Sequence, residues 1–376
     1  MRSIKLIAVL MMLLQPAIAQ QTDFNFINFS SKDGLSSNTV NAILKDRYGY
    51  VWFATDDGIN KFDGVNFTVY RHNPSDSTSI GPGAVMAMQE DRFGNLWVGT
   101  GQTLSLYDRE KDVFINYDFT ENTAIRSLCA DHKGNIWVGT YYGLFVFDPH
   151  TRKTKSYKAD TARADGLLSD AIISVFEDSR NRVWIGTIAG LHLYMENNDG
   201  FKRFVHSPAD SLSVPDSKIR SIAEDLNGHI WVGTNNGGLS VLQPDEKSFT
   251  TYRHRSADAG SISNDCIYTI SVENTGKLWL GTEEGLNIFD PASAKVTRIA
   301  GDSRNRYSLT GKSVRSIFLG KDGIYWIGTY QAGVNKHDKN LAFFNLRQSN
   351  PFDLHGLSSP TVTSFVENPA GDIYIG

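Results

Sequence analysis

The stretch DHKGNIWVGTYYGL at residues 131–144 decides the fold, because its pattern recurs along the chain. The pattern is Asp-x-x-Gly-x-x-Trp-x-Gly-Thr-x-x-Gly-Leu. Thr follows every Trp by three residues, and Gly follows by two in every copy except the first, which has Ala54. The pattern contains all seven tryptophans of the chain, at spacings of 40 to 48 residues: Trp52, Trp97, Trp137, Trp184, Trp231, Trp279 and Trp326. Such regular spacing indicates a repeat architecture.

Each repeat reads as four short strands. In the first, the segments 40–45, 51–55, 59–62 and 67–70 are rich in β-branched and aromatic residues and are separated by turn residues. No segment has a convincing helical periodicity. We therefore predict an all-β fold, a seven-bladed β-propeller of four-stranded antiparallel blades, plus the start of an eighth repeat. The Trp of the second strand should wedge between blades, and the Gly after it should allow the next blade to approach closely.

The two ends of the repeat array raise the question of ring closure. The segment 24–29 resembles a fourth strand and could complete the last blade, hiding its edge, or it could be a mere entry strand. An eighth copy begins near Val362, has Tyr374 at the Trp position and stops at Gly376. We expect residues 20–350 to form the propeller and 351–376 to be the truncated start of an eighth repeat or a second propeller, in a fragment of a longer protein. A chain ended near Asn350 should then be more soluble.

The N-terminus has the features of an export signal. Arg2 and Lys5 precede the apolar segment 6–14, and the segment 17–19 has the small-x-small pattern of a cleavage site. We predict a signal peptide at residues 1–19 and a periplasmic location for the rest. An uncleaved anchor is the alternative.

Composition narrows the class of protein further. Of the 376 residues, 40% are hydrophobic and 21% are charged, which is typical of a globular protein rather than a disordered one. The formal net charge of -4 argues against non-specific nucleic-acid binding by this chain. Cys129 and Cys266 are too few for a disulfide framework, and we expect free thiols.

The repeat and its linkers resemble a known family. Linkers of the form Gly-Leu-Ser or Ser-Leu-Ser lie between units, at residues 34–36, 211–213, 261–263 (Ser-Ile-Ser) and 356–358. Together with the Trp motif they resemble the two-component regulator propeller repeat, over about residues 33–376. Two local departures are Gly320 in place of the turn acid and the missing later Gly near Thr103.

The resemblance implies a role for a longer parent protein. The family forms the periplasmic half of hybrid two-component system histidine kinases in Bacteroidetes-type bacteria. It implies a second propeller, a small β-sandwich, one membrane helix in the inner membrane, a kinase and often a DNA-binding output, working as a homodimer. The implied task is to detect oligosaccharides and switch on genes for their use. We find no phosphoacceptor box, nucleotide-binding lid or receiver domain in this sequence, so any kinase activity belongs to missing residues.

The sequence shows little sign of a catalytic, metal-binding or cofactor-binding site. The nine histidines do not pair at metal-ligand spacing, and no EF-hand or phosphate-binding loop is present, so we expect no metal, cofactor or catalytic residue. Acid pairs such as Asp56-Asp57 could suggest glycosidase carboxylates. They occupy equivalent turns of different blades, which favours solvated turn acids.

The loops between second and third strands should share one face of the ring. Aromatic rings there could stack on sugars, and amides and acids could bind sugar hydroxyls. The candidate ligand-binding residues are Asp56, Asp57, Tyr141, Tyr142, Asn235, Asn236, Glu283, Glu284, Tyr330 and Gln331. The alternative is that these are ordinary polar loops, with ligand contacts made by the second propeller or between the two.

The sequence is compatible with three functions. The first is a non-catalytic sensor module for oligosaccharides. The second is an extracytoplasmic propeller enzyme, a polysaccharide lyase or glycoside hydrolase, which should show a non-repeating cluster of acids, His or Arg. The third is a protein-binding scaffold, which should show a large exposed apolar patch. All three share one fold, so the fold cannot choose among them.

Overall fold

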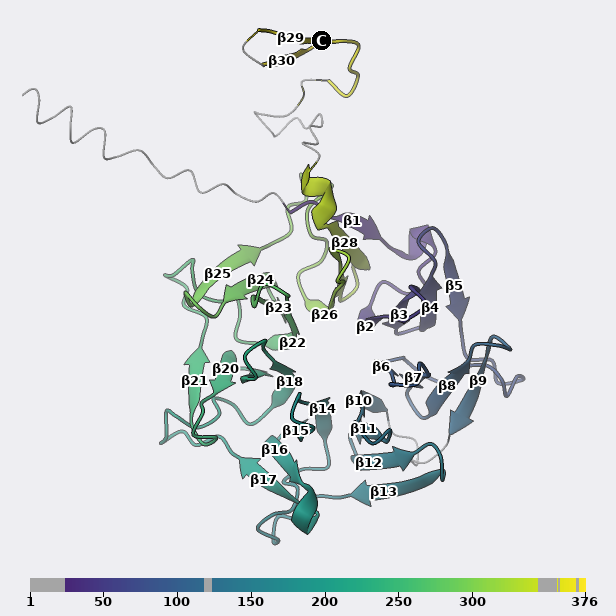
Figure 1. The fold of residues 1–376 in the computed structure, drawn as a ribbon, viewed down its shortest axis with the longest axis vertical. Coiled ribbons are helices and arrows are strands. Elements are labelled where there is room, and N and C mark those ends of the chain that lie inside the picture. Colours follow the sequence, from purple (N-terminus) through teal and green to yellow (C-terminus); the bar gives the residue numbers. More distant parts are fainter. Residues whose placement is uncertain (1–23, 118–123, 344–356, 358, 370–371) are drawn as a thin grey trace, which may run out of the picture.

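The computed structural model describes residues 24–117, 124–343, 357, 359–369 and 372–376. Among these residues, seven four-stranded antiparallel sheets surround a central axis (Figure 1), which confirms the predicted propeller. Apart from strands, the regular elements are three short 3-10 turns: η1 (Ser31–Asp33), η2 (Glu196–Asn198) and η3 (Lys339–Phe343).

The four strands of each blade run outward from the axis in a constant order (Figure 1). The innermost strands are β2 (Val40–Lys45), β6 (Ala87–Glu90), β10 (Ile125–Ala130), β14 (Ile172–Glu177), β18 (Ile219–Glu224), β22 (Ile267–Val272) and β26 (Val314–Leu319). The second strands are β3 (Val51–Thr55), β7 (Leu96–Gly99), β11 (Ile136–Thr140), β15 (Val183–Thr187), β19 (Ile230–Thr234), β23 (Leu278–Thr282) and β27 (Ile324–Thr329). The third strands are β4 (Gly58–Phe62), β8 (Leu104–Asp108), β12 (Gly143–Asp148), β16 (Gly190–Met195), β20 (Leu239–Leu242), β24 (Gly285–Asp290) and β28 (Val334–Asp338). The outer strands are β5 (Phe67–Tyr70), β9 (Val113–Tyr117), β13 (Lys153–Tyr157), β17 (Gly200–Phe204), β21 (Phe249–Tyr252), β25 (Lys295–Ile299) and β1 (Ile27–Phe29).

The core lies between blades, where the second-strand tryptophans are buried. Trp52 is 0% exposed and its ring lies 5.0 Å from that of Tyr107 in the next blade. A side chain on the glycine that follows would collide with that neighbour: a Cβ on Gly233 would lie 2.8 Å from Cγ2 of Ile267. Both predicted roles, the wedge and the close approach, are therefore confirmed.

The turn between the first and second strands is held by the motif's aspartate. The carboxylate of Asp131 accepts hydrogen bonds from the backbone N–H groups of Lys133 (2.9 Å) and Asn135 (2.8 Å) and from the indole Nε1 of Trp137 (2.9 Å). The glycine of the turn needs a positive φ, and Asn181 takes its place in the fourth blade with φ +62°. One side chain thus fixes the turn and orients the Trp.

The sixth blade departs from this arrangement at a position that the sequence pattern did not single out. Glu273 stands where the first five blades have Asp and the seventh has Gly320, and the indole Nε1 of Trp279 is buried with no partner among the described residues. The Glu273 carboxylate instead accepts hydrogen bonds from the hydroxyl of Tyr325 (2.7 Å), the amine of Lys339 (2.7 Å) and the hydroxyl of Thr275 (2.6 Å). The longer side chain therefore links the sixth blade to the seventh.

This buried carboxylate should make the protein sensitive to acid. Burial alone would raise the pKa of Glu273, but hydrogen bonds from Lys339, Thr275 and Tyr325 outweigh it and lower the pKa from 4.5 to about 2. Between these values the unfolded chain binds the proton and the folded chain does not. The free energy of unfolding should therefore fall as pH drops from 4.5 to about 2, by up to about 1.4 kcal/mol per pH unit.

Urea unfolding of the wild type and of Glu273→Gln across this pH range checks the expectation. The variant should be less stable near neutral pH and should lose less stability on acidification, because its amide does not titrate. Equal acid slopes for the two proteins would contradict the role assigned to Glu273.

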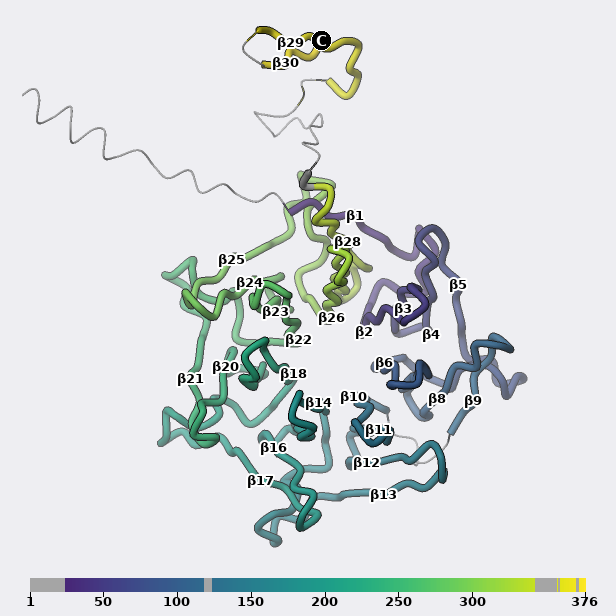
Figure 2. Tube along the Cα trace, in the orientation of Figure 1, coloured from purple at the N-terminus to yellow at the C-terminus, as the bar shows by residue number. Residues whose placement is uncertain are grey.

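The ring is closed by the N-terminal strand. β1 pairs antiparallel with β28, with Ile27 opposite Lys336 and Phe29 opposite Val334, and Figure 2 shows the purple β1 beside the yellow-green β28. Phe26 is 1% exposed in the cluster that contains Trp279. The segment 24–29 therefore completes the seventh blade, and the entry-strand alternative is wrong.

The remaining sequence predictions have mixed outcomes. Cys129 and Cys266 are free thiols, as expected, although Cys266 is only partly buried. The predicted signal peptide and the predicted boundary at residue 350 lie outside the described residues. Beyond that boundary, β29 (Phe365–Glu367) pairs with β30 (Ile373–Ile375), the hairpin expected of an eighth repeat. Among the described residues, no helix is long and apolar enough to cross a membrane.

Candidate functional site

The loops between second and third strands lie on one face of the ring, here called the loop face. A buried threonine ends each second strand, or directly follows it in the second blade, and fixes the loop that comes next. The hydroxyl of Thr140 donates to the carbonyl oxygen of Gly143 (2.9 Å) and accepts from the N–H of Tyr142 (3.0 Å). This bonding leaves the two residues at the loop tip facing solvent, and Tyr141 and Tyr142 are 45% and 63% exposed.

The first residue of each loop pair contacts the innermost strand of its own blade. The Asp56 carboxylate accepts from the Asn41 amide (3.0 Å), and the Asn235 side-chain oxygen accepts from Nε of Arg220 (2.8 Å). The same relation holds for Tyr141 beside Arg126, for Glu283 beside Tyr268 and for Tyr330 beside Arg315. The structure thus places Asp56, Tyr141, Asn235, Glu283 and Tyr330 towards the axis.

The second residue of each pair has other contacts. Asp57 forms an ion pair with Arg71, which follows the outer strand β5 (2.9 Å). Glu284 forms one with Lys312 in the linker to the next blade (2.9 Å). The remaining second residues are Tyr142, Asn236 and Gln331; Tyr142 and Asn236 use their backbone atoms to bind Lys158, Arg253 and Asp216. The ten candidate residues therefore form two groups, of which only the first adjoins the axis.

Sequence reasoning missed the residues that the first group contacts. They occupy the second position of the innermost strands, and we call them the axial ring: Asn41, Arg126, Arg220, Tyr268 and Arg315. In each of these strands the pairing with the second strand shifts register at this residue, as between Ile219 and Ser221 around Arg220. Such bulges re-aim a side chain and are frequent beside functional sites.

A signal for the axial ring does exist in the repeat. The residues before and after this position are similar in these blades, with Val or Ile before it and Ala, Ser or Thr after it. Only the position between them changes character from blade to blade, from amide to guanidinium to phenol. Packing between blades restricts the residue types at the neighbouring positions but not at this one. Its side chain can therefore serve to bind a ligand.

Two guanidinium groups lie against one aromatic ring in this region. The guanidinium carbons of Arg220 and Arg315 lie 4.6 Å and 3.8 Å from the centre of the Tyr268 ring. Burial, and then the hydrogen bond to Glu283, raise the pKa of Tyr268, so its phenol stays protonated. The axial end of the loop face therefore combines aromatic surface with charge, which suits a polar ligand with flat apolar faces.

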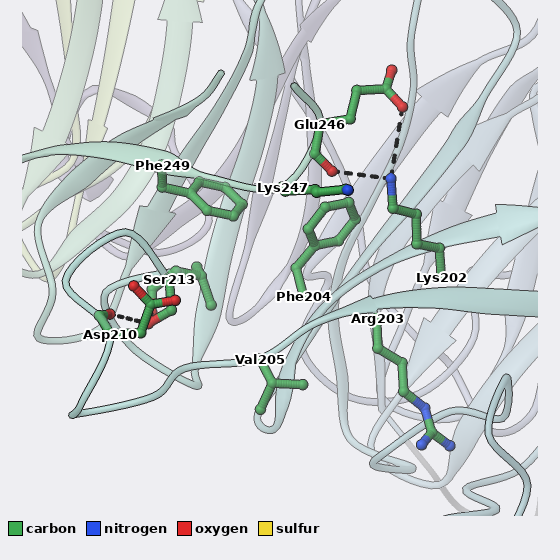
Figure 3. A pocket seen from close by; sticks show the side chains of 10 residues that line it. Lys202, Arg203, Phe204, Val205, Asp210, Ser213, Glu246, Lys247 and Phe249 are labelled. Carbon is green, nitrogen blue, oxygen red and sulfur yellow. Dashed lines mark hydrogen bonds and ion pairs between the residues drawn. The ribbon is translucent and has the colours of Figure 1, made fainter. Parts of the chain in front are cut away.

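Two pockets lie away from the axial ring. One, of about 210 Å³, opens at the edge of the fourth and fifth blades, where Figure 3 shows Lys202 pointing at Glu246; the Lys202 amine lies 3.0 Å from its carbonyl oxygen and 3.7 Å from its carboxylate. The other, of about 470 Å³, lies beside Asp225 and His229 at the opposite end of the blades. The polar groups named in these two pockets already pair with one another and hold the turns of the blades. We therefore do not place the functional site there.

Within the described part of the chain, no group of three or more His, Cys, Asp or Glu side chains could hold a metal ion. The acid pairs Asp56-Asp57 and Glu283-Glu284, which the sequence analysis interpreted as turn acids, do not form a shared site, because the two members of each pair contact different partners. No catalytic constellation is thus assembled from them.

Comparison with known proteins bears on the family. The two-component regulator propeller model matches residues 34–57, 79–102, 120–142, 166–189, 213–236 and 308–331. The extracellular domain of a putative hybrid two-component system from B. thetaiotaomicron is 27% identical, with a TM-score of 0.74 over 94% of this chain and 47% of that one. Histidine kinase P4 of Formosa agariphila is 52% identical over 62 residues, which are 16% of this chain and 4% of the kinase.

More distant structures share the fold alone. Virginiamycin B lyase from Staphylococcus aureus is 12% identical, with a TM-score of 0.64 over 84% of this chain and 98% of the lyase. At that identity the likeness carries no conclusion about activity. The chain spans about half of the matched two-component system domain. The repeats, the fold and the 27% identical relative agree on one assignment. The chain belongs to the two-component regulator propeller family.

Proposed function

We propose that this chain is the ligand-sensing propeller of a hybrid two-component signalling protein and that it detects oligosaccharides outside the cytoplasm. The relatives support the first part, because one is the extracellular domain of a putative hybrid system and another is a histidine kinase. In this proposal the second propeller, the inner-membrane helix and the kinase belong to a longer parent protein that acts as a homodimer.

The observation that carries the ligand class is the set of exposed aromatic rings on the loop face. Tyr141, Tyr142 and Tyr330 are 45%, 63% and 45% exposed, and Asn235 and Glu283 lie in equivalent loops. Phenol rings can stack on the apolar faces of pyranose rings while amides and carboxylates bind hydroxyl groups. A ligand that binds one arrangement of the parent dimer better than another would shift its population and so carry the signal.

A glycan array tests the proposal. The wild type should retain one class of oligosaccharide, and Tyr141→Ala with Tyr142→Ala should weaken that binding at least about tenfold, because two stacking rings are lost. Tyr48→Ala is the matched control, since Tyr48 is also 63% exposed but lies at the turn between first and second strands, on the opposite face. Unchanged affinity in the double variant, or no glycan retained at all, would contradict the proposal.

The same array separates a sensor from an enzyme. A sensor should release the bound oligosaccharide intact, as judged by mass spectrometry of the eluate. Shortened or unsaturated products would instead favour a glycoside hydrolase or a polysaccharide lyase.

A further inference from the structure

Four cationic side chains gather at the axial end of the loop face. Arg126, Arg220 and Arg315 belong to the axial ring, and Lys218 precedes β18 in the linker. Among the described residues, neither Arg126 nor Arg220 has a carboxylate within ion-pair distance, and the Arg220 guanidinium donates to the neutral amide of Asn235 and lies against the Tyr268 ring. Arg315 has Glu283 at 3.9 Å, near the limit for an ion pair. Positive charge therefore exceeds negative charge here.

These cations are close enough to affect one another. Arg220 and Arg315 both lie against the Tyr268 ring, at 4.6 Å and 3.8 Å. Burial and then the charges of Arg220 and Arg126 lower the pKa of Lys218. Like charges held together in a partly buried region repel one another, so their proximity costs free energy unless an anion joins them.

Two of the guanidinium groups also have donors without an acceptor. Nε of Arg126 and Nε of Arg315 are buried and have no hydrogen-bond partner among the described residues. A buried N–H without a partner costs free energy, and most buried polar groups in folded proteins are satisfied. Each guanidinium offers five donors in a planar fork that matches an oxyanion.

The acidic groups nearby offset the cluster only in part: Asp216 counters the charges that lower the pKa of Lys218, and neither Arg126 nor Arg220 has a carboxylate partner among the described residues. Glu283 accepts hydrogen bonds from the hydroxyls of Tyr268 and Ser313, and Asp56 binds the amide of Asn41. Both carboxylates are thus engaged by neutral donors, and Glu283 offsets only part of the charge of Arg315, at 3.9 Å. The charges of Arg126 and Arg220, which no carboxylate of the described residues pairs, remain for an anion that comes from outside the chain.

We propose that the axial ring binds the anionic groups of an acidic oligosaccharide, a uronate carboxylate or a sulfate ester, through Arg126, Arg220 and Arg315. The inference rests on the proposed function and narrows its ligand class from oligosaccharides in general to charged ones. The tyrosines of the loop pairs then stack on the sugar rings, while the guanidinium groups bind the charges through paired hydrogen bonds.

Isothermal titration tests the inference with four probes: tetragalacturonate, a sulfated carrageenan tetrasaccharide, neutral maltotetraose and sodium sulfate. The wild type should bind at least one of the two acidic tetrasaccharides at least about tenfold more tightly than maltotetraose, and raising the salt concentration should weaken that binding. The tetrasaccharide that binds more tightly identifies the anionic group as carboxylate or sulfate.

Arginine variants test where the acidic tetrasaccharide binds. Arg126→Gln with Arg220→Gln should weaken acidic binding at least about tenfold, and Arg126→Lys with Arg220→Lys should retain part of it, because the charge is kept. Arg180→Gln is the control, since Arg180 is exposed in a turn at the opposite end of the blades. If the glutamine variant does not fold, the salt dependence of wild-type binding still decides.

The outcomes distinguish this inference from the proposed function. Binding of maltotetraose as tight as that of the acidic probes, unaffected by the Arg variants, would overturn the inference and leave an oligosaccharide sensor standing. Binding of sulfate alone, lost in the glutamine variant, would support the anion site and contradict the oligosaccharide ligand. Absence of binding by every anionic probe would overturn the inference.

Discussion

A chain that begins at Ser31 is expected to lose cooperative folding, in contrast to one that begins at Gln20. The shorter chain lacks β1, so β28 loses its partner strand and the seventh blade keeps a bare edge. It also lacks Phe26, which is 1% exposed, and Phe29, whose ring lies 5.8 Å from that of Trp326. Loss of one buried Phe already costs about 3–5 kcal/mol, so the whole deletion should exceed about 5 kcal/mol.

Calorimetry and light scattering measure this effect. The shorter chain should show no sharp unfolding transition, or should associate through the β28 edge. Phe26→Ala is a milder version that keeps the strand, and Ile27→Ala is its control because Ile27 is 47% exposed. A monomeric short chain with an unchanged melting temperature would show that β1 does not close the ring.

Replacement of Asp46 by Ala is expected to destabilise the propeller by about 3–5 kcal/mol, because a buried, paired charge is removed and its partners are stranded. The Asp46 carboxylate, 0% exposed, accepts hydrogen bonds from the indole of Trp52 (2.8 Å) and from two backbone N–H groups, and pairs with Arg109 of the next blade (2.8 Å). The substitution therefore loosens the turn, the Trp wedge and one contact between blades.

Urea unfolding of Asp46→Ala and Asp57→Ala gives the comparison. Asp57 is a control from the same blade, since its ion pair with Arg71 is more than half exposed on both sides and should contribute about 0–1 kcal/mol. Equal losses of unfolding free energy in the two variants would contradict the stabilising role assigned to the buried turn.

The fold could be predicted from the sequence because the Trp and turn residues that pack the blades recur along the chain. The Trp motif and the period of about 47 residues predicted blades of four strands, and the structure confirms the strands of the first repeat to within one residue. The role of the segment 24–29 in ring closure stayed open between a completing strand and an entry strand, because nothing in this segment identifies the strand with which it pairs. The partner, β28, lies more than 300 residues away in sequence and is fixed by the circular arrangement of all seven blades.

The candidate site was predictable only in part. Loop residues could be placed on one face because the threonine-bounded turns recur, yet adjacent residues such as Asp56 and Asp57 looked alike in sequence. The turn geometry directs one to the axis and the other to the outer strand. The axial arginines were overlooked because a charged residue inside a short strand resembles an ordinary solvated position until the neighbouring strands close around the axis.

Hydrogen–deuterium exchange of the protein, with and without the acidic tetrasaccharide that binds it, shows directly whether the axial ring and its loops hold the ligand. We expect slower exchange in the loop pairs at residues 141–142, 235–236 and 330–331 and at the starts of β10, β18 and β26. Protection confined to the opposite face or to the outer strands, or no change on the loop face at saturating ligand, would contradict this placement of the ligand.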